Sequence, residues 1–288
     1  MYWIQERYTV RSFCASLSQV TNQADHAASP AVDGPVTRSP LGDSVSNSDP
    51  ERGLSLLWRG LDPAARGPKA RLTLDQLAKA GVAVADTQGL GAVSIRRVAA
   101  ELGVGPMSLY TYVPSKVELL ELMIDRVFGE IARAGSELGW RARLEFLAGE
   151  RWRLFRRHPW VLQSNLSRIP LGPNVLDAVE DLYAAFDGST LPALQVVSLV
   201  GAIDEYLQGA ARTMAIEEQE VTGTGVSYEQ HWAARASFWG KYFDAERYPM
   251  HLKLWERGGF DDNPLGYEFG LARILDGIEV LAPAGSSD

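Results

Sequence analysis

Two short segments with helical spacing, separated by a glycine and a proline, constrain this chain more than any other feature. After Ser94, apolar residues recur at the i, i+3, i+4 and i+7 spacing of one helical face. Gly103 suits the left-handed conformation that ends a helix, and Pro106 suits the first turn of the next one. Pro114 then ends the second segment. The run 94–116 therefore predicts two short helices joined by a tight turn.

The outward side chains of the second segment, about 106–112, are of kinds that bind DNA, while Leu109 and Val113 are expected to anchor it inward. Hydroxyls, a thioether and tyrosines reach base edges, thymine methyl groups and phosphates when a helix enters a major groove about 12 Å wide. Two arginines begin the first segment, where the helix dipole disfavours cations, so an external phosphate would explain them. The alternative is an ordinary surface hairpin. The predicted DNA-binding residues here are Ser94, Arg96, Arg97, Gly105, Pro106, Met107, Ser108, Tyr110, Thr111, Tyr112 and Lys116.

Charge is distributed unevenly along the chain. The 288 residues carry a net charge of −8, which taken alone disfavours a nucleic-acid partner. Residues 59–116, however, hold eight Arg or Lys residues against four acids. Lys69 and Arg71 belong to a basic arm, predicted over 56–71, that either lies along DNA or is a solvated linker. The acidic remainder is expected to project away from DNA.

Composition argues against several classes of protein. With the single cysteine Cys14, the chain forms no internal disulfide, and a reducing, cytoplasmic compartment is expected. No apolar run approaches the roughly 18 to 20 residues that span a bilayer, so no membrane partner is expected. The four histidines lack the i, i+4 spacing of a helical metal site, and no nucleophile elbow, Walker loop or dinucleotide fingerprint occurs. We therefore predict no enzyme, no cofactor and no metal.

Residues 1–55 carry little periodic pattern, and 21–49 are rich in small and polar residues. Such a composition buries too little surface to fold, so we predict a disordered extension. A targeting peptide is disfavoured by Glu6 and by the lack of a clean apolar core. A start codon assigned too far upstream would also account for the extension. Helical spacing between Leu54 and Leu61 predicts a short amphipathic turn after it.

Helices are also predicted on both sides of the turn motif. Thr73 begins a capping-box pattern, and an apolar stripe then runs to a stop at Gly89. Ser115 begins a second capping-box pattern ahead of another long apolar stripe. We predict an all-α domain over 72–132, in which these two helices support the turn motif.

This run resembles the DNA-binding domain of the tetracycline-repressor (TetR) family of bacterial regulators over about sixty residues. The resemblance implies an all-helical homodimer that binds a near-palindromic operator, usually as a repressor released by a small ligand. In that family, residues matching Arg96, Pro106–Ser108 and Tyr110–Tyr112 meet DNA, and the one matching Lys116 touches phosphate. The chain departs from common family members at Pro106 and Met107, so no operator sequence is implied. The matching residues are the alanine-rich helix ending at Asp86 and Gly89, then Val93-Ser94-Ile95, Val98-Ala99, Leu102-Gly103-Val104, Leu109-Tyr110, Val113, Lys116 and Leu119-Leu120.

Helical patterns continue over 133–288, which we predict to be a helical-bundle ligand-binding and dimerisation domain. A very long helix is expected over about 190–220 and a final one over about 264–281. Small residues along the long helix suit close packing. They either pack within the chain or, because a twofold operator needs twofold protein symmetry, form a dimeric four-helix bundle with the last helix.

A ligand pocket between such helices would be mostly apolar with a few polar groups. The Trp and Tyr content suits a small hydrophobic or aromatic effector, although each candidate is also explained as core or surface. The rival interpretation is a helical small-molecule carrier, or an enzyme, that does not bind DNA. The candidate ligand residues are Trp152, His158, Trp160, Gln163, Asn165, Tyr183, Tyr206, Gln208, Arg212, His231 and Trp232.

Overall fold

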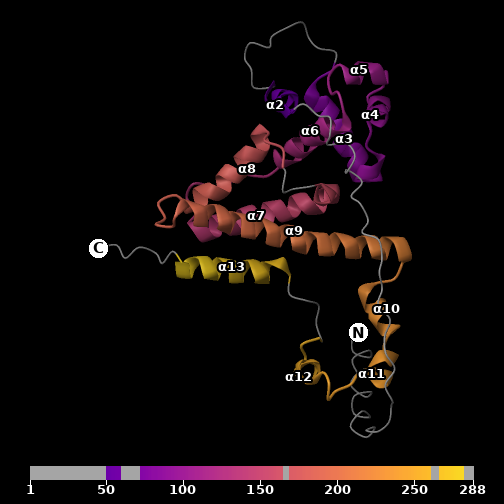
Figure 1. The fold of residues 1–288 in the computed structure, drawn as a ribbon, viewed down its shortest axis with the longest axis vertical. Helices are drawn as coiled ribbons and strands as arrows, with labels where there is room; N and C mark the ends of the chain where they lie inside the picture. Colours follow the sequence, from indigo (N-terminus) through magenta and orange to yellow (C-terminus); the bar gives the residue numbers. More distant parts are fainter. Residues whose placement is uncertain (1–49, 60–71, 165–168, 261–265, 282–288) are drawn as a thin grey trace. The chain divides into compact units, whose positions relative to one another are not determined.

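The computed structural model of the protein describes residues 50–59, 72–164, 169–260 and 266–281. All regular structure in these ranges is helical (Figure 1), which confirms the predicted all-α fold class. The described residues form two compact units: one contains the residues up to 224 together with 266–281, and the other contains 225–260. No helix in the described ranges is both long enough and apolar enough to cross a bilayer.

The first described helix is α2 (Pro50–Trp58). It packs against α6 (Lys116–Phe128), and its side chains Leu56 and Leu57 are buried. The Trp58 indole also donates a hydrogen bond to the Leu171 carbonyl, ahead of α8, at 2.9 Å. The predicted helical turn is therefore present but begins earlier, and the prediction of disorder up to residue 55 is wrong from Pro50 onward. Residues 1–49 and the arm residues Lys69 and Arg71 lie outside the described residues.

The predicted turn motif consists of α4 and α5; α3 and η3 precede it, and α6 follows it. Thr73 caps α3 in a capping box with Gln76, as predicted. The helix ends at Gly89, whose φ of 80° favours glycine. A second positive φ, 66° at Gly103, makes the turn between α4 and α5. The elements are α3 (Leu74–Gln88), η3 (Leu90–Ala92), α4 (Ile95–Glu101) and α5 (Pro106–Tyr110).

The start of α6 differs from the prediction in detail. The Ser115 hydroxyl accepts a hydrogen bond from the Val117 amide, at 3.1 Å, as a helix cap should. The Glu118 carboxylate, however, accepts from the Ser115 hydroxyl rather than from a backbone amide. Neither bond of the predicted reciprocal box is therefore formed: the hydroxyl caps the second amide of the helix rather than the third, and Glu118 is buried.

The remaining helices of the first unit form a bundle around α9, which runs alongside α7 and α13 (Figure 1). At 32 residues α9 is the long helix that the sequence predicted, shifted a few residues toward the C-terminus and followed by Gly225 with φ 70°. The predicted division between residues 132 and 133 falls between α6 and α7. The elements are α7 (Trp140–Arg157), η4 (Pro159–Gln163), α8 (Pro173–Tyr183), η6 (Ala184–Phe186), α9 (Ala193–Thr224) and α13 (Tyr267–Leu281).

The second unit holds three short helices: α10 (Tyr228–Ala233), α11 (Ser237–Lys241) and α12 (Pro249–Glu256). Aromatic side chains hold it together, with ring centroids 4.6 Å apart between Trp239 and Trp255 and 5.1 Å apart between Trp239 and Phe243. None of the residues in these three helices is buried. The unit is therefore organised by ring contacts rather than by a closed core.

Candidate nucleic-acid interface and effector domain

The outward face of α5 is open to solvent, as a helix that enters DNA requires. Leu109 and Val113 are buried as predicted, with exposed fractions of 0% and 1%, and fix the inner face. Tyr112 differs from its neighbours because it is half-buried and packs against the hydrophobic core. The exposed members of the predicted set on and beside α5 are Gly105, Pro106, Met107, Ser108, Tyr110 and Thr111.

The two arginines of α4 have different surroundings. Ser94 caps the helix by accepting a hydrogen bond from the Arg97 amide, at 3.2 Å. The Arg97 side chain donates to the Gln88 side chain, at 3.3 Å, and pairs with Glu101, at 3.2 Å. Arg96 is exposed and forms no hydrogen bond or ion pair with the described residues. Arg96 is therefore a cation without a partner in the described part of the chain, whereas Arg97 is neutralised within its own domain.

Lys116 lies at the first position of α6, close to η3. Its ammonium Nζ lies 3.5 Å from the carbonyl oxygen of Leu90, to which it donates. The side chain is half-buried. Its predicted contact with phosphate stays a prediction, and the Leu90 carbonyl holds the ammonium beside the turn motif.

A polar cluster around two buried side chains, which was not predicted from the sequence, ties α3 to the segment that follows α7. We call Asp86, Glu130, His158 and Trp160 the Asp86 joint. The Trp160 indole donates to Asp86 Oδ1, at 2.7 Å, and His158 Nδ1 lies 2.7 Å from the same oxygen. His158 Nε2 lies 3.2 Å from Glu130 Oε2. His158 and Trp160, predicted as ligand residues, thus link the turn-motif domain to η4, and their predicted ligand role stays a prediction.

One further arginine, Arg157, pairs with the joint. Arg157 Nη1 donates to Glu130 Oε2, at 2.9 Å. Burial alone would raise the pKa of Glu130, but the hydrogen bonds and charges of Arg157 and His158 outweigh it and hold that pKa below its ordinary value. The Glu130 carboxylate is therefore held in its ionised form.

A second polar tie joins α6 to α8. Asp125 Oδ1 accepts hydrogen bonds from the backbone amides of Asn174 and Val175, both at 3.0 Å, and Oδ2 accepts from the Asn174 side chain, at 2.8 Å. Asp125 thus caps α8 from a neighbouring helix, and it approaches Gly172 so closely that a side chain there would collide with it. Burial raises the pKa of Asp125, with the hydrogen bonds opposing the increase.

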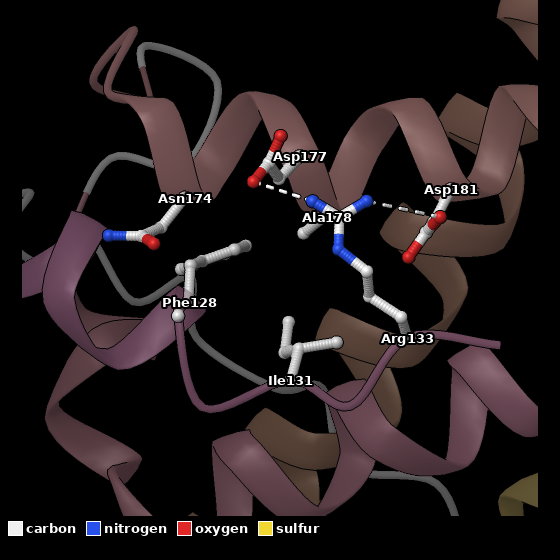
Figure 2. A pocket seen from close by; sticks show the side chains of 8 residues that line it. Phe128, Ile131, Arg133, Asn174, Asp177, Ala178 and Asp181 are labelled. Atoms are coloured by element: carbon white, nitrogen blue, oxygen red, sulfur yellow. Dashed lines mark ion pairs between the residues drawn. The ribbon is translucent and has the colours of Figure 1, made fainter. Parts of the chain in front are cut away.

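A cavity of about 200 Å³ lies beside this tie (Figure 2). Arg133 bridges two acids of α8, with its guanidinium 2.6 Å from Asp177 and 3.7 Å from Asp181. The cavity is smaller than the roughly 300–1,000 Å³ of common ligand sites. None of the predicted ligand residues lines it; its walls are Phe128, Gly129, Ile131, Arg133, Asn174, Asp177, Ala178 and Asp181.

The predicted ligand residues do not gather in one pocket. Trp152 stacks on Tyr267 with ring centroids 4.1 Å apart, and the Tyr206 hydroxyl donates to the Tyr267 carbonyl, at 3.0 Å, so these two candidates share a neighbour. Arg212 donates to the Leu162 carbonyl of η4, at 3.2 Å, and to the Gln208 side chain, also at 3.2 Å. Of the others, Tyr183 is half-buried on α8, Gln163 is exposed, Asn165 lies outside the described residues, and His231 and Trp232 belong to the second unit.

The bundle also contains a buried ion pair that was not predicted from the sequence. Arg151 on α7 is only 4% exposed, and its Nε lies 3.3 Å from Asp204 Oδ1 on α9. Burial raises the pKa of Asp204, and the Arg151 charge opposes this. Arg151 Nη2 has no hydrogen-bond partner among the described residues, and the guanidinium lies 5.5 Å from the centre of the Phe128 ring. An arginine on the apolar stripe of α7 was the signal available in the sequence.

Comparison with known proteins identifies the class to which this turn motif and bundle belong. Residues 77–123 match the family model of bacterial regulatory proteins of the TetR family. Residues 135–282 match the model of the tetracyclin repressor-like C-terminal domain. The chain therefore belongs to the TetR family of transcriptional regulators, a non-enzymatic family whose members bind DNA through a helix-turn-helix. In the described residues, no group of His, Cys, Asp and Glu side chains is placed to hold a metal.

Individual relatives agree with this assignment. The HTH-type transcriptional repressor DrrR1 of Streptomyces coeruleorubidus is 43% identical over 242 residues, which cover 83% of this chain and 89% of DrrR1. Among solved structures, ActR of Streptomyces coelicolor in complex with actinorhodin superposes with a TM-score of 0.62 at 25% identity, covering 75% of this chain and all of ActR. The complex of ActR with (S)-DNPA gives a TM-score of 0.59 at 24% identity, covering 74% and 100%, and shows the fold alone.

Proposed function

We propose that the protein is a homodimeric repressor that binds a near-palindromic operator and is released by a small hydrophobic or aromatic ligand. The main support for a DNA-binding surface is the exposed outer face of α5, whose inner face is anchored by the buried Leu109. Arg96, on the preceding helix, is a cation that is unpaired among the described residues. The proposed base-facing helix, α5, has no charged residue, whereas Arg96 and Lys116 lie on the neighbouring helices α4 and α6. That arrangement is suited to phosphate contacts around a groove-reading helix. A DNA-binding regulator of this kind acts where the chromosome lies, in the bacterial cytoplasm.

Dimerisation is supported by the surface of the two helices expected to form the bundle. Large apolar side chains of both α9 and α13 are exposed in the single chain, and burial of such side chains against a second copy would remove them from water. Twofold symmetry in the protein would match a near-palindromic operator. The exposed residues are Leu194, Val197, Ile216 and Val221 on α9, and Phe269, Val280 and Leu281 on α13.

The effector class is supported by a relative and by the bundle itself. ActR, which shares the fold, has been solved with actinorhodin bound. In this chain Trp152, Tyr206 and Tyr267 already form an aromatic group between α7, α9 and α13. Flat aromatic ligands pack favourably against such side chains. We propose that this group forms one wall of the effector site.

Selection of genomic DNA fragments by the full chain, followed by binding measurements at several salt concentrations, tests the operator assignment. Phosphate contacts release counterions, so affinity should fall steeply as salt rises. Lys116→Ala should weaken binding at every salt concentration, whereas Lys79→Ala, an exposed lysine of α3 paired with Asp75, is the matched control. A chain that binds no fragment at low salt, yet still binds actinorhodin, would favour the small-molecule carrier instead.

A further inference from the structure

We propose that Met107 reads the C5 methyl group of a thymine, so that each operator half-site carries thymine where the tip of α5 meets the major groove. This inference rests on the proposed operator binding and adds to it the chemical group that is recognised. It makes Met107 the residue that determines specificity at one base pair.

The position of Met107 on α5 follows from helix geometry. Residues advance by about 100° per position, so Met107 and Thr111 point almost directly away from Leu109. Leu109 is fully buried, whereas Met107 is 76% exposed. Met107 is therefore the most exposed large apolar side chain of α5, on the face opposite its buried anchor, and the described part of the turn-motif domain leaves it uncovered.

The chemistry of α5 leaves few other ways to discriminate bases. Its five residues, Pro106 to Tyr110, include none of the side chains that make bidentate contacts with guanine or adenine, which are Arg, Lys, Asn and Gln, and no Asp or Glu to accept from cytosine. Thr111, on the same face, already donates its hydroxyl hydrogen to the Ser108 carbonyl, at 2.6 Å. Direct recognition through the outermost face must therefore be mainly apolar. In the major groove of unmodified DNA, only thymine presents a methyl group.

Gly105 supplies an independent observation at the same tip. Its φ of −70° and ψ of 140° are available to any residue, and a β-carbon there would meet no atom within 4 Å. The fold of the chain therefore does not require glycine at this position. A glycine that its own fold does not need suits a place where another molecule comes close to the backbone.

The experiment replaces each thymine of the selected operator, one at a time, by deoxyuridine. This change removes the methyl group and leaves every hydrogen-bonding group of the base in place. Burial of one methyl group corresponds to a change in affinity of about fourfold. We expect one or two positions in each half-site at which deoxyuridine weakens binding by about that factor, and full affinity at the other thymines.

Met107→Ala should abolish the deoxyuridine penalty at those positions, because the variant no longer contacts the methyl group. Met250→Ala is the matched control: Met250 is also exposed, at 59%, but lies on α12 in the other unit, so its variant should keep the full penalty. Replacing the sensitive thymine by cytosine should weaken binding by the wild type, and 5-methylcytosine should restore part of the loss.

The outcomes separate this inference from the function on which it rests. If the chain binds an operator but tolerates deoxyuridine at every thymine, within twofold, the proposal that Met107 recognises a thymine methyl group is wrong, while the operator assignment stands. The same conclusion follows if Met107→Ala keeps the wild-type pattern of penalties. A chain that binds no genomic fragment overturns the operator assignment and this inference together.

Discussion

Two five-residue helices, α5 and η4, begin with the same local signal and end in opposite environments. Each has a proline in its first turn. In α5 only Leu109 is buried, and the remaining side chains lie at the surface. In η4 three consecutive residues, Trp160 to Leu162, are buried, and Trp160 is also bonded to Asp86. A proline starts both helices, but the side chains that follow it decide which helix stays exposed and which one is built into the core.

Trp160→Ala should produce the largest effect, because it empties the core beneath η4. Trp160 is 1% exposed, and Trp or Phe to Ala changes in cores cost about 3–5 kcal/mol. We expect the free energy of unfolding in urea to fall by about 4 kcal/mol. Met107→Ala on α5 should change it by less than about 0.5 kcal/mol. Equal losses in the two variants would remove the contrast between the helices.

Asp86→Ala tests the polar side of the same contrast. It leaves the Trp160 indole without an acceptor and removes one partner of His158. A buried donor that loses its partner costs about 1–3 kcal/mol, so we expect a loss near 2 kcal/mol in urea unfolding. Asp75→Ala in the same helix breaks an exposed ion pair with Lys79 and one with the half-buried Arg126, and should cost about 1 kcal/mol or less. Equal free energies of unfolding for Asp86→Ala and Asp75→Ala would show that the Asp86 joint does not stabilise the fold.

The parts of the fold that local signals determine were predictable from the sequence. Ser94 and Thr73 cap the predicted helices, and Gly89 and Gly103 make the predicted turns. These features depend on neighbours within a few residues, and the apolar spacing around them specifies which face is buried. The exposed face of α5 could therefore be assigned from residue spacing alone, apart from the half-buried Tyr112.

The parts that depend on distant partners were not predictable. Histidine is a residue type that often binds ligands, and His158 was predicted to do so. Its partners, Asp86 and Glu130, lie 72 and 28 positions away in the sequence, so no periodicity could reveal them. The same is true of Arg151 with Asp204. Polar residues in an apolar stripe signal a buried bond or a ligand contact, and the sequence does not distinguish the two.

Arg96→Ala should weaken operator binding about fivefold and make the negative slope of log affinity against log salt shallower by about one, as expected for loss of one phosphate contact. The thermal midpoint should not change, because Arg96 has no partner among the described residues. Arg157→Ala, next to η4, is the matched control: this arginine pairs with Glu130 and should leave the salt slope unaltered. An unchanged slope in Arg96→Ala would remove α4 from the proposed interface.

Glu130→Gln should give the smallest effect, and its sign is set by the lowered pKa of Glu130. A carboxyl whose folded pKa lies below its unfolded value contributes stability that is present above about pH 4.5 and is lost as the pH falls through the folded pKa. The wild type should thus exceed the variant in stability by under about 1 kcal/mol at pH 7, and the difference should vanish on acidification.

Asp125→Asn should show the opposite pH trend, because burial raises the pKa of Asp125. The stability that the raised pKa contributes is present at low pH and is lost as the pH rises through the folded pKa. Urea unfolding between pH 7 and pH 3 measures both, and parallel curves for the two variants would contradict the assignment.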